Sequence, residues 1–132
     1  MAIETQAPPT THTIVHYEIA AKDAKKLVAF YGGIFGWQFK GAPGMEDYLM
    51  ADTGGENDAD IAIYDSESAE KTRPTNYIGV TSVKEYVEKI TAHGGTIIHQ
   101  FTVPHMGHGA VALDPEQNPI GIWQQDRDAR ES

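Results

Sequence analysis

The chain opens with a strand-like pattern that changes to a helical one. Residues 13–20 (TIVHYEIA) are rich in β-branched side chains, which predicts a strand. Asp23 follows as a candidate N-cap for a helix from Ala24, and Gly36 offers a left-handed stop. Between them, apolar residues recur at i, i+3/i+4 and i+7, which predicts one buried helical stripe. The stripe consists of Leu27, Val28, Tyr31, Ile34 and Phe35.

The same order begins again after residue 75. Residues 76–81 predict a strand, and a second helix ends at Gly94 and Gly95. The stripe of this helix consists of Val83, Tyr86, Val87 and Ile90. Short apolar runs after each helix predict further strands. These are 37–40, 48–51 and 61–64 in the first half, and 96–103, 109–113 and 119–124 in the second.

An internal repeat relates the two halves. Residues 23–31 overlay 82–90, and residues 61–64 overlay 120–123, both at an offset of 59 (82 − 23 and 120 − 61). Repeated units of this kind cannot each cover their own apolar face, so they pack against each other. We therefore expect an α+β fold in which two paired βαβββ modules form a curved mixed sheet, a half-barrel cup with the helices outside. The expected boundaries are a flexible arm at 1–12, a first module at 13–64, a linker at 65–75, a second module at 76–125 and a tail at 126–132, in one structural domain.

Strand parity predicts which side chains face the cup. Because side chains alternate across a strand, Val15, Tyr17 and Ile19 should meet the helix, and His16 and Glu18 should face the cup. A concave surface with aromatic side chains and a few polar groups is typical of a small-molecule site. The alternative is that the aromatic rings only fill the core. The expected binding residues besides His16 and Glu18 are Tyr64, Tyr77, Trp123, Thr75, Ala62 and Gly121.

Composition excludes several classes of partner. The 132 residues include 19 acidic and 10 basic side chains, and the net charge of −9 repels nucleic acid and anionic membranes. There is no cysteine, which excludes disulfides and thiolate metal sites. No apolar stretch reaches the roughly 20 residues that span a bilayer. We expect a cytoplasmic protein that binds neither nucleic acid nor membrane.

Three segments resemble a known family. The segments VHYEIAAKDAKKLVAFYGGIFGWQF, AHGG and GHGAVALDPEQNPIGIW, within residues 13–125, are similar to the vicinal-oxygen-chelate superfamily. That superfamily includes glyoxalases, bleomycin-resistance proteins, fosfomycin-resistance enzymes and extradiol dioxygenases. The resemblance implies paired βαβββ modules and a homodimer. In the enzymatic members it also implies a divalent metal, held by His or Glu near the start of each module's first strand and in each module's last strand.

Four positions test that metal site. His16 stands at the first, seven residues before Asp23, and the repeat places Thr75 at the matching position. The two remaining positions fall on Ala62 and Gly121, which have no ligating side chain. A catalytic metal generally needs about three protein ligands, so we expect no metal and no other cofactor. The alternative is a divalent metal in a remodelled site at His16, with Glu18 as a second ligand.

The remaining histidines and glycine pairs predict no further site. His105 and His108 are expected in a solvated turn, with a shared metal ion as the alternative. The glycine pairs at 32–33 and 94–95 lie at helix C-termini, where the helix dipole repels phosphate.

Three functions fit these observations. The first, which we favour, is a protein that binds a small, partly apolar or aromatic molecule in the cup without the full metal site, like the bleomycin-resistance members. The second is a metal-dependent lyase, isomerase or dioxygenase of glyoxalase type that uses His16 and a remodelled ligand set. The third is a metal-free enzyme in which His16, oriented by Glu18, is the general acid or base.

Overall fold

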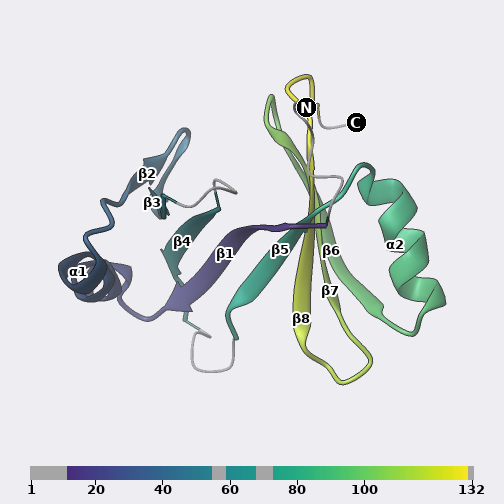
Figure 1. The fold of residues 1–132 in the computed structure, drawn as a ribbon, viewed down its shortest axis with the longest axis horizontal. Helices are drawn as coiled ribbons and strands as arrows, with labels where there is room; N and C mark the ends of the chain where they lie inside the picture. The colour runs from purple at the N-terminus through teal and green to yellow at the C-terminus, as the bar shows by residue number, and fades with distance from the viewer. Residues whose placement is uncertain (1–11, 55–58, 68–72, 131–132) are drawn as a thin grey trace. The chain divides into compact units, whose positions relative to one another are not determined.

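The computed structural model describes residues 12–54, 59–67 and 73–130, and its elements run along the chain as two successive strand–helix–strand–strand–strand sets (Figure 1). The predicted α+β fold with two βαβββ modules is confirmed. The chain forms two compact units, residues 15–75 (the first unit) and residues 76–132 together with the N-terminal 14 residues (the second unit). The predicted flexible arm, apart from His12, lies outside the described residues.

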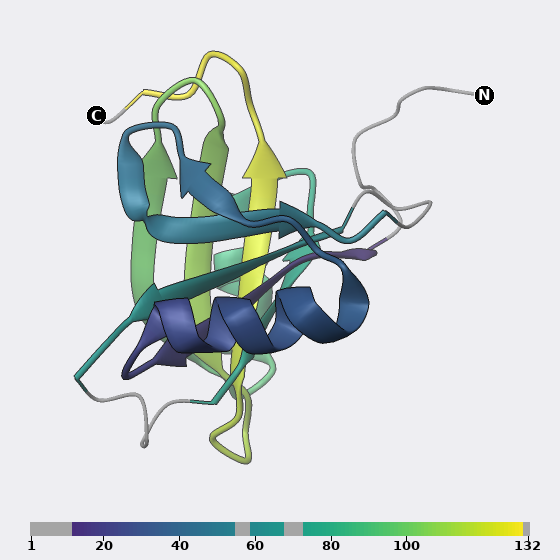
Figure 2. The ribbon, with the colours of Figure 1, turned by 90° about the vertical axis from the view of Figure 1, so that its left-hand side faces the viewer.

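The first unit packs one helix on a mixed sheet. In this sheet β3 lies between β2 and β4, and β4 also pairs with β1 in parallel, whereas the β2–β3 and β3–β4 pairs are antiparallel. Figure 2 shows α1 lying along this sheet. Ile63 is the fully buried centre of the packing, with Ile19 and Leu27 against it. The elements are β1 (Ile14–Ala21), α1 (Ala24–Phe35), β2 (Lys40–Ala42), β3 (Met45–Asp52) and β4 (Asp60–Asp65).

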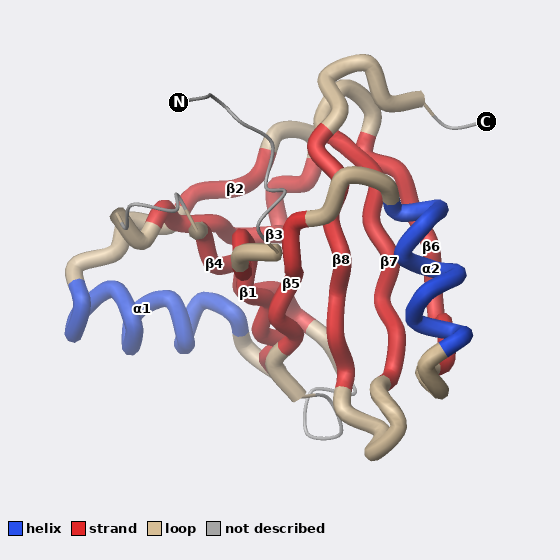
Figure 3. Tube along the Cα trace, turned by 45° about the vertical axis from the view of Figure 1, so that its right-hand side comes forward, coloured by secondary structure: helices blue, strands red, loops and turns tan. Residues whose placement is uncertain are grey.

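The second unit has the same plan. Its strands run in the order β5-β8-β7-β6, with β5 and β8 parallel and the other neighbours antiparallel. Helix α2 packs on one face of the sheet through Val83, against Val80, Ala110 and Ile122 (Figure 3). The elements are β5 (Thr75–Gly79), α2 (Val83–Ala92), β6 (Thr96–Val103), β7 (Gly107–Leu113) and β8 (Pro119–Gln125).

The predicted ends of the first helix are confirmed, whereas the second helix ends at Ala92, before the predicted Gly94. The Asp23 side chain accepts a hydrogen bond from the Lys26 N–H, and Gly36 adopts a left-handed φ of 76° at the C-cap. Asp65, at the end of β4, adds a second cap because it accepts from the Ala24 N–H at 2.7 Å. Ser82 caps α2 in the same way, through the Glu85 N–H.

Part of the predicted core is wrong. Ile34 and Phe35 of the first helical stripe are exposed, and the Phe35 ring contacts Tyr31 and Trp37. Tyr17, expected on the helix face of β1, is 37% exposed and does not join the core. Ile19, also expected on the helix face of β1, does pack against the core of the first unit.

Several strand boundaries also differ from the prediction. The predicted strand 37–40 becomes β2 at Lys40–Ala42, which forms a tight hairpin with β3 through Gly44 at φ 76°. The predicted linker 65–75 is shorter in the structure, because Asp65 is the last residue of β4 and Thr75 is the first residue of β5. The predicted turn at 104–108 is shorter, because β7 begins at Gly107 and includes His108. Within the described residues, no helix has the length and apolar character needed to cross a membrane.

Candidate functional site

A polar network surrounds His16 in the first unit. The His16 Nδ1 atom contacts the Asp60 carboxylate, and Nε2 lies 2.7 Å from the Tyr48 hydroxyl. That hydroxyl donates to Glu18 Oε2 at 2.5 Å. The register explains the arrangement, because His16 is the Cα partner of Asp60 across the parallel β1–β4 pair and Glu18 follows on the same face of β1. Two carboxylates, one imidazole and one phenol therefore form a single chain.

Hydrogen bonds link His16 to both carboxylates of this chain. The Asp60 carboxylate only accepts, and it fixes one edge of the imidazole ring at Nδ1. The Tyr48 hydroxyl gives its one hydrogen to Glu18 and joins that carboxylate to His16 Nε2. The network is partly buried, where such bonds are stronger than in water.

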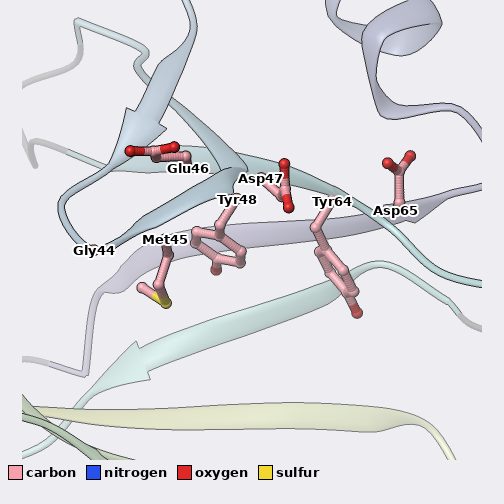
Figure 4. A pocket seen from close by; sticks show the side chains of 7 residues that line it. All are labelled: Gly44, Met45, Glu46, Asp47, Tyr48, Tyr64 and Asp65. Carbon is pink, nitrogen blue, oxygen red and sulfur yellow. The ribbon is translucent and has the colours of Figure 1, made fainter.

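Two stacked tyrosines connect this network to a pocket. The rings of Tyr48 and Tyr64 lie 5.9 Å apart at 28°. Both line a pocket of about 610 Å³ at the β2–β3 hairpin. Figure 4 shows the two tyrosine rings side by side, with the Asp47 and Asp65 carboxylates directed away from the tyrosine hydroxyls. Besides the two tyrosines, Asp47 and Asp65, the pocket is lined by Gly44, Met45 and Glu46.

Tyr64 is held in its neutral form. Burial raises the pKa of the Tyr64 phenol above its ordinary value near 10, and the Glu18 carboxylate raises it further, because both disfavour the phenolate. Tyr64 therefore stays a hydrogen-bond donor at the pocket wall throughout the physiological pH range.

The raised pKa of Tyr64 predicts a pH dependence of stability. Above pH 10 the unfolded chain loses this proton while the folded protein keeps it, so the free energy of unfolding falls as the pH rises from 10 to the folded-state pKa. Below pH 10 this contribution is fully present. We expect the Tyr64→Phe variant to show a shallower loss of stability above pH 10 than the parent protein, measured by urea unfolding. Parallel curves for the two proteins would contradict this.

The second unit presents an aromatic face of its own. Phe101 lies between Tyr77, at 6.5 Å and 79°, and Trp123, at 6.4 Å and 32°. Glycines make room for these rings. A Cβ atom on Gly121 would come within 2.4 Å of the Tyr77 ring, and one on Gly109 within 2.4 Å of the Phe101 ring. The aromatic rings therefore lie directly against the backbone of the sheet.

The predicted site residues fall into two groups. The structure brings His16, Glu18 and Tyr64 together in the first unit, and Tyr77, Gly121 and Trp123 together in the second. Ala62 and Thr75 are both buried. At Gly121 the ring of Tyr77, itself only 5% exposed, occupies the space that a side chain would enter.

Sequence reasoning missed two members of the network, Asp60 and Tyr48. Asp60 could have been predicted from the sequence, because alternation along β4 places it on the same face as Ala62 and Tyr64. No sequence pattern predicted the contact of Tyr48 with His16, since this contact depends on how β3 pairs in the sheet. The sequence also misplaced His108, which lies in β7 and bonds to Thr102 and Asp126 instead of facing solvent in a turn.

Comparison with known proteins identifies the family. The family model for the glyoxalase/bleomycin resistance protein/dioxygenase superfamily matches residues 13–122. The chain belongs to this superfamily. No curated protein matches it significantly.

Solved structures share the fold of this superfamily member. Methylmalonyl-CoA epimerase from Mycobacterium tuberculosis is 13% identical, with 94% of each chain covered and a TM-score of 0.67. The hypothetical protein BH1468 from Bacillus halodurans C-125 is 18% identical, covering 90% of this chain and 98% of its own, with a TM-score of 0.63. A glyoxalase/bleomycin resistance protein/dioxygenase superfamily member from Vibrio splendidus 12B01 is 12% identical, covering 86% and 98%, with a TM-score of 0.63.

The residues present do not fit the divalent metal that many members of the superfamily bind. Of the four ligand positions that the resemblance implies, only His16 has an imidazole or carboxylate, and both of its ring nitrogens have protein partners. Ala62 and Gly121 provide no donor atom on their side chains. Across residues 12–54, 59–67 and 73–130, no group of three or more His, Asp or Glu side chains could hold a metal ion.

Proposed function

We propose that this protein binds a small, partly apolar or aromatic molecule at the Tyr48–Tyr64 pocket, without the divalent metal of its relatives. One observation carries the proposal. Tyr48 lines the pocket with its ring, and its hydroxyl bridges His16 to Glu18. A ligand on the tyrosine rings therefore lies next to a polar network that can recognise its oxygen or nitrogen atoms.

The dimensions and chemistry of the pocket support a small ligand. Its volume of about 610 Å³ lies within the range of roughly 300–1,000 Å³ that ligand pockets occupy. Two stacked tyrosines offer rigid apolar surface at low conformational cost. The Glu46, Asp47 and Asp65 carboxylates on the lining repel anions, so the proposed ligand is neutral or cationic.

A neutral aromatic probe, N-phenyl-1-naphthylamine, tests this proposal by its fluorescence. We expect saturable binding that Tyr64→Ala weakens by about 10-fold, since a buried aromatic contact is worth about 1.4 kcal/mol or more. Tyr17→Ala is the matched control, because Tyr17 is exposed and, as the residue next to His16 on β1, lies on the opposite face of that strand. Equal weakening in both variants, or no saturable binding, would contradict the proposal.

Metal removal tests the proposal that the ligand binds without a divalent metal. Dialysis against EDTA should leave the affinity for the probe unchanged, because the network around His16 is complete without an ion. Affinity that falls after dialysis and returns with zinc or manganese would favour the metal-dependent alternative.

A second candidate function is metal-free proton transfer. The Asp60 carboxylate orients the His16 imidazole, and Tyr48 links that imidazole to the pocket. An oriented histidine that shares a hydrogen bond with a pocket hydroxyl is suited to general acid or base chemistry. In this function His16 is the general acid or base, Glu18 accepts the hydrogen bond of the Tyr48 hydroxyl, and Asp60 is a positioning residue.

We also propose a cytoplasmic homodimer. The outer surface of α1 exposes Phe30, Ile34 and Phe35, an aromatic and aliphatic surface of the kind that subunit contacts cover. Light scattering at micromolar concentration should give twice the chain mass. A monomer mass would contradict the dimer, and Phe35→Lys should produce one if this surface is the contact.

A further inference from the structure

A second hydrogen-bonded cluster lies in the second unit and shares no residue with the network around His16. The Thr102 hydroxyl lies 2.9 Å from His108 Nδ1, and His108 Nε2 lies 3.1 Å from Asp126 Oδ2. Thr102 on β6 is the Cα partner of His108 on β7, and Asp126 follows the last residue of β8. Three adjacent strands therefore place a hydroxyl, an imidazole and a carboxylate in a row.

The bonds in this row assign a tautomer to neutral His108. The carboxylate of Asp126 only accepts, so Nε2 carries the hydrogen. The lone pair is then on Nδ1, which accepts the hydrogen of the Thr102 hydroxyl. A hydroxyl that donates to an imidazole oriented by a carboxylate is the arrangement that activates an oxygen nucleophile.

The row opens into its own pocket. Thr102 and His108 line a pocket of about 760 Å³ beside the first turn of α2. Their side chains are only partly buried, so a substrate can reach them. The other lining residues are Ser82, Val83, Lys84, Gln100, Phe101, Gly109 and Gln124.

The same pocket contains groups that stabilise negative charge. Gln124 Oε1 accepts from the Val83 N–H at 2.9 Å, which fixes the amide orientation and makes its NH₂ group the donor side. Lys84 contributes an ammonium to the lining. Donors and a cation that share a pocket with a nucleophile favour the oxyanion that forms during acyl transfer.

We propose that Thr102, His108 and Asp126 form a second catalytic site that hydrolyses small carboxylic esters. Thr102 Oγ1 attacks the carbonyl carbon while its proton moves to His108 Nδ1. The C–O bond of the ester breaks, the leaving alcohol takes that proton, and the acyl group remains on Thr102. Water then gives a proton to His108 and attacks the acyl carbon, and the released Thr102 oxygen takes the proton back. The balance is ester plus water to acid plus alcohol, with no redox change.

The three residues have different roles in this site. Thr102 is the nucleophile, His108 is the general base and then the general acid, and Asp126 is a positioning residue that holds the imidazole by its Nε2 hydrogen. The site goes beyond the proposed ligand binding, and it shares no residue with the Tyr48–Tyr64 pocket.

Hydrolysis of p-nitrophenyl acetate by the full chain tests the proposal. We expect a burst of p-nitrophenolate and a protein mass increase of one acetyl group, on the peptide that contains Thr102. Thr102→Val keeps the shape of the side chain and removes the hydroxyl, so it should abolish the burst and lower kcat/KM by about 100-fold. Thr102→Ser should retain the burst, because it restores the hydroxyl. Asp126→Asn should lower kcat with little change in KM.

Matched controls separate this site from general surface chemistry. Thr91→Val, His93→Asn and Asp128→Asn change the same residue types at exposed positions of the second unit, and should leave the rate unchanged. Thermal unfolding of each variant confirms that the fold is intact. Unchanged hydrolysis in Thr102→Val, or acetylation of a lysine instead of Thr102, would overturn the proposal.

Discussion

Replacing Ile63 with alanine is expected to lower the free energy of unfolding by about 2–5 kcal/mol, the usual cost of removing a large side chain from a packed core. Ile63 on β4 is fully buried, and it packs against α1 at the centre of the first unit. The deletion leaves a cavity that neighbours such as Leu27 fill only in part.

Urea unfolding monitored by circular dichroism measures this loss. Ile98→Ala is the matched control, because Ile98 is 56% exposed and should change the free energy of unfolding by less than about 0.5 kcal/mol. Similar losses in the two variants would show that the helix α1 does not pack on β4 as described.

Replacing Gly121 with alanine is expected to lower the free energy of unfolding by about 1–3 kcal/mol, although the change adds only one methyl group. The new Cβ atom would lie 2.4 Å from the ring of Tyr77, which is buried and has little room to move. Gly121→Leu should be more destabilising for the same reason.

A control and a double variant test whether contact with the Tyr77 ring causes the loss of stability in Gly121→Ala. A Cβ atom on Gly33 in α1 meets nothing within 4 Å, so Gly33→Ala should stabilise the protein by about 0.5–1 kcal/mol through helix propensity. In a Tyr77→Ala background, Gly121→Ala should lose most of its cost, since the ring that it contacts is gone. An unchanged cost in that background would contradict the steric explanation.

The packing of Tyr77 against Gly121 also affects whether the metal site of the superfamily could be rebuilt in this protein. Gly121 stands at a position where the superfamily resemblance implies a metal ligand, and here the Tyr77 ring occupies the adjacent space. Ala62, at the equivalent position of the first unit, is 0% exposed. A glutamate introduced at either position would meet filled space or would bury its charge, so a single substitution is not expected to rebuild the metal site.

The sequence by itself determined the features that depend on local pattern. Helical spacing, the N-cap at Asp23 and the left-handed stop at Gly36 depend on residues a few positions apart, and the 59-residue repeat emerges when the sequence is aligned with itself. Alternation along each strand also placed His16, Glu18 and Tyr64 on one face before any contact was known. The α+β fold with its two βαβββ modules follows from these patterns.

Only the tertiary structure decided which side chains meet across strands. Asp60 and Tyr48 reach His16 because of the register of β4 and β3, and His108 meets Thr102 and Asp126 because three strands place them in a row. The filling of the space at Gly121 by the Tyr77 ring has the same origin. Local periodicity fixes the face on which a side chain lies, but a cross-strand partner depends on register, and register is set by the packing of the whole sheet.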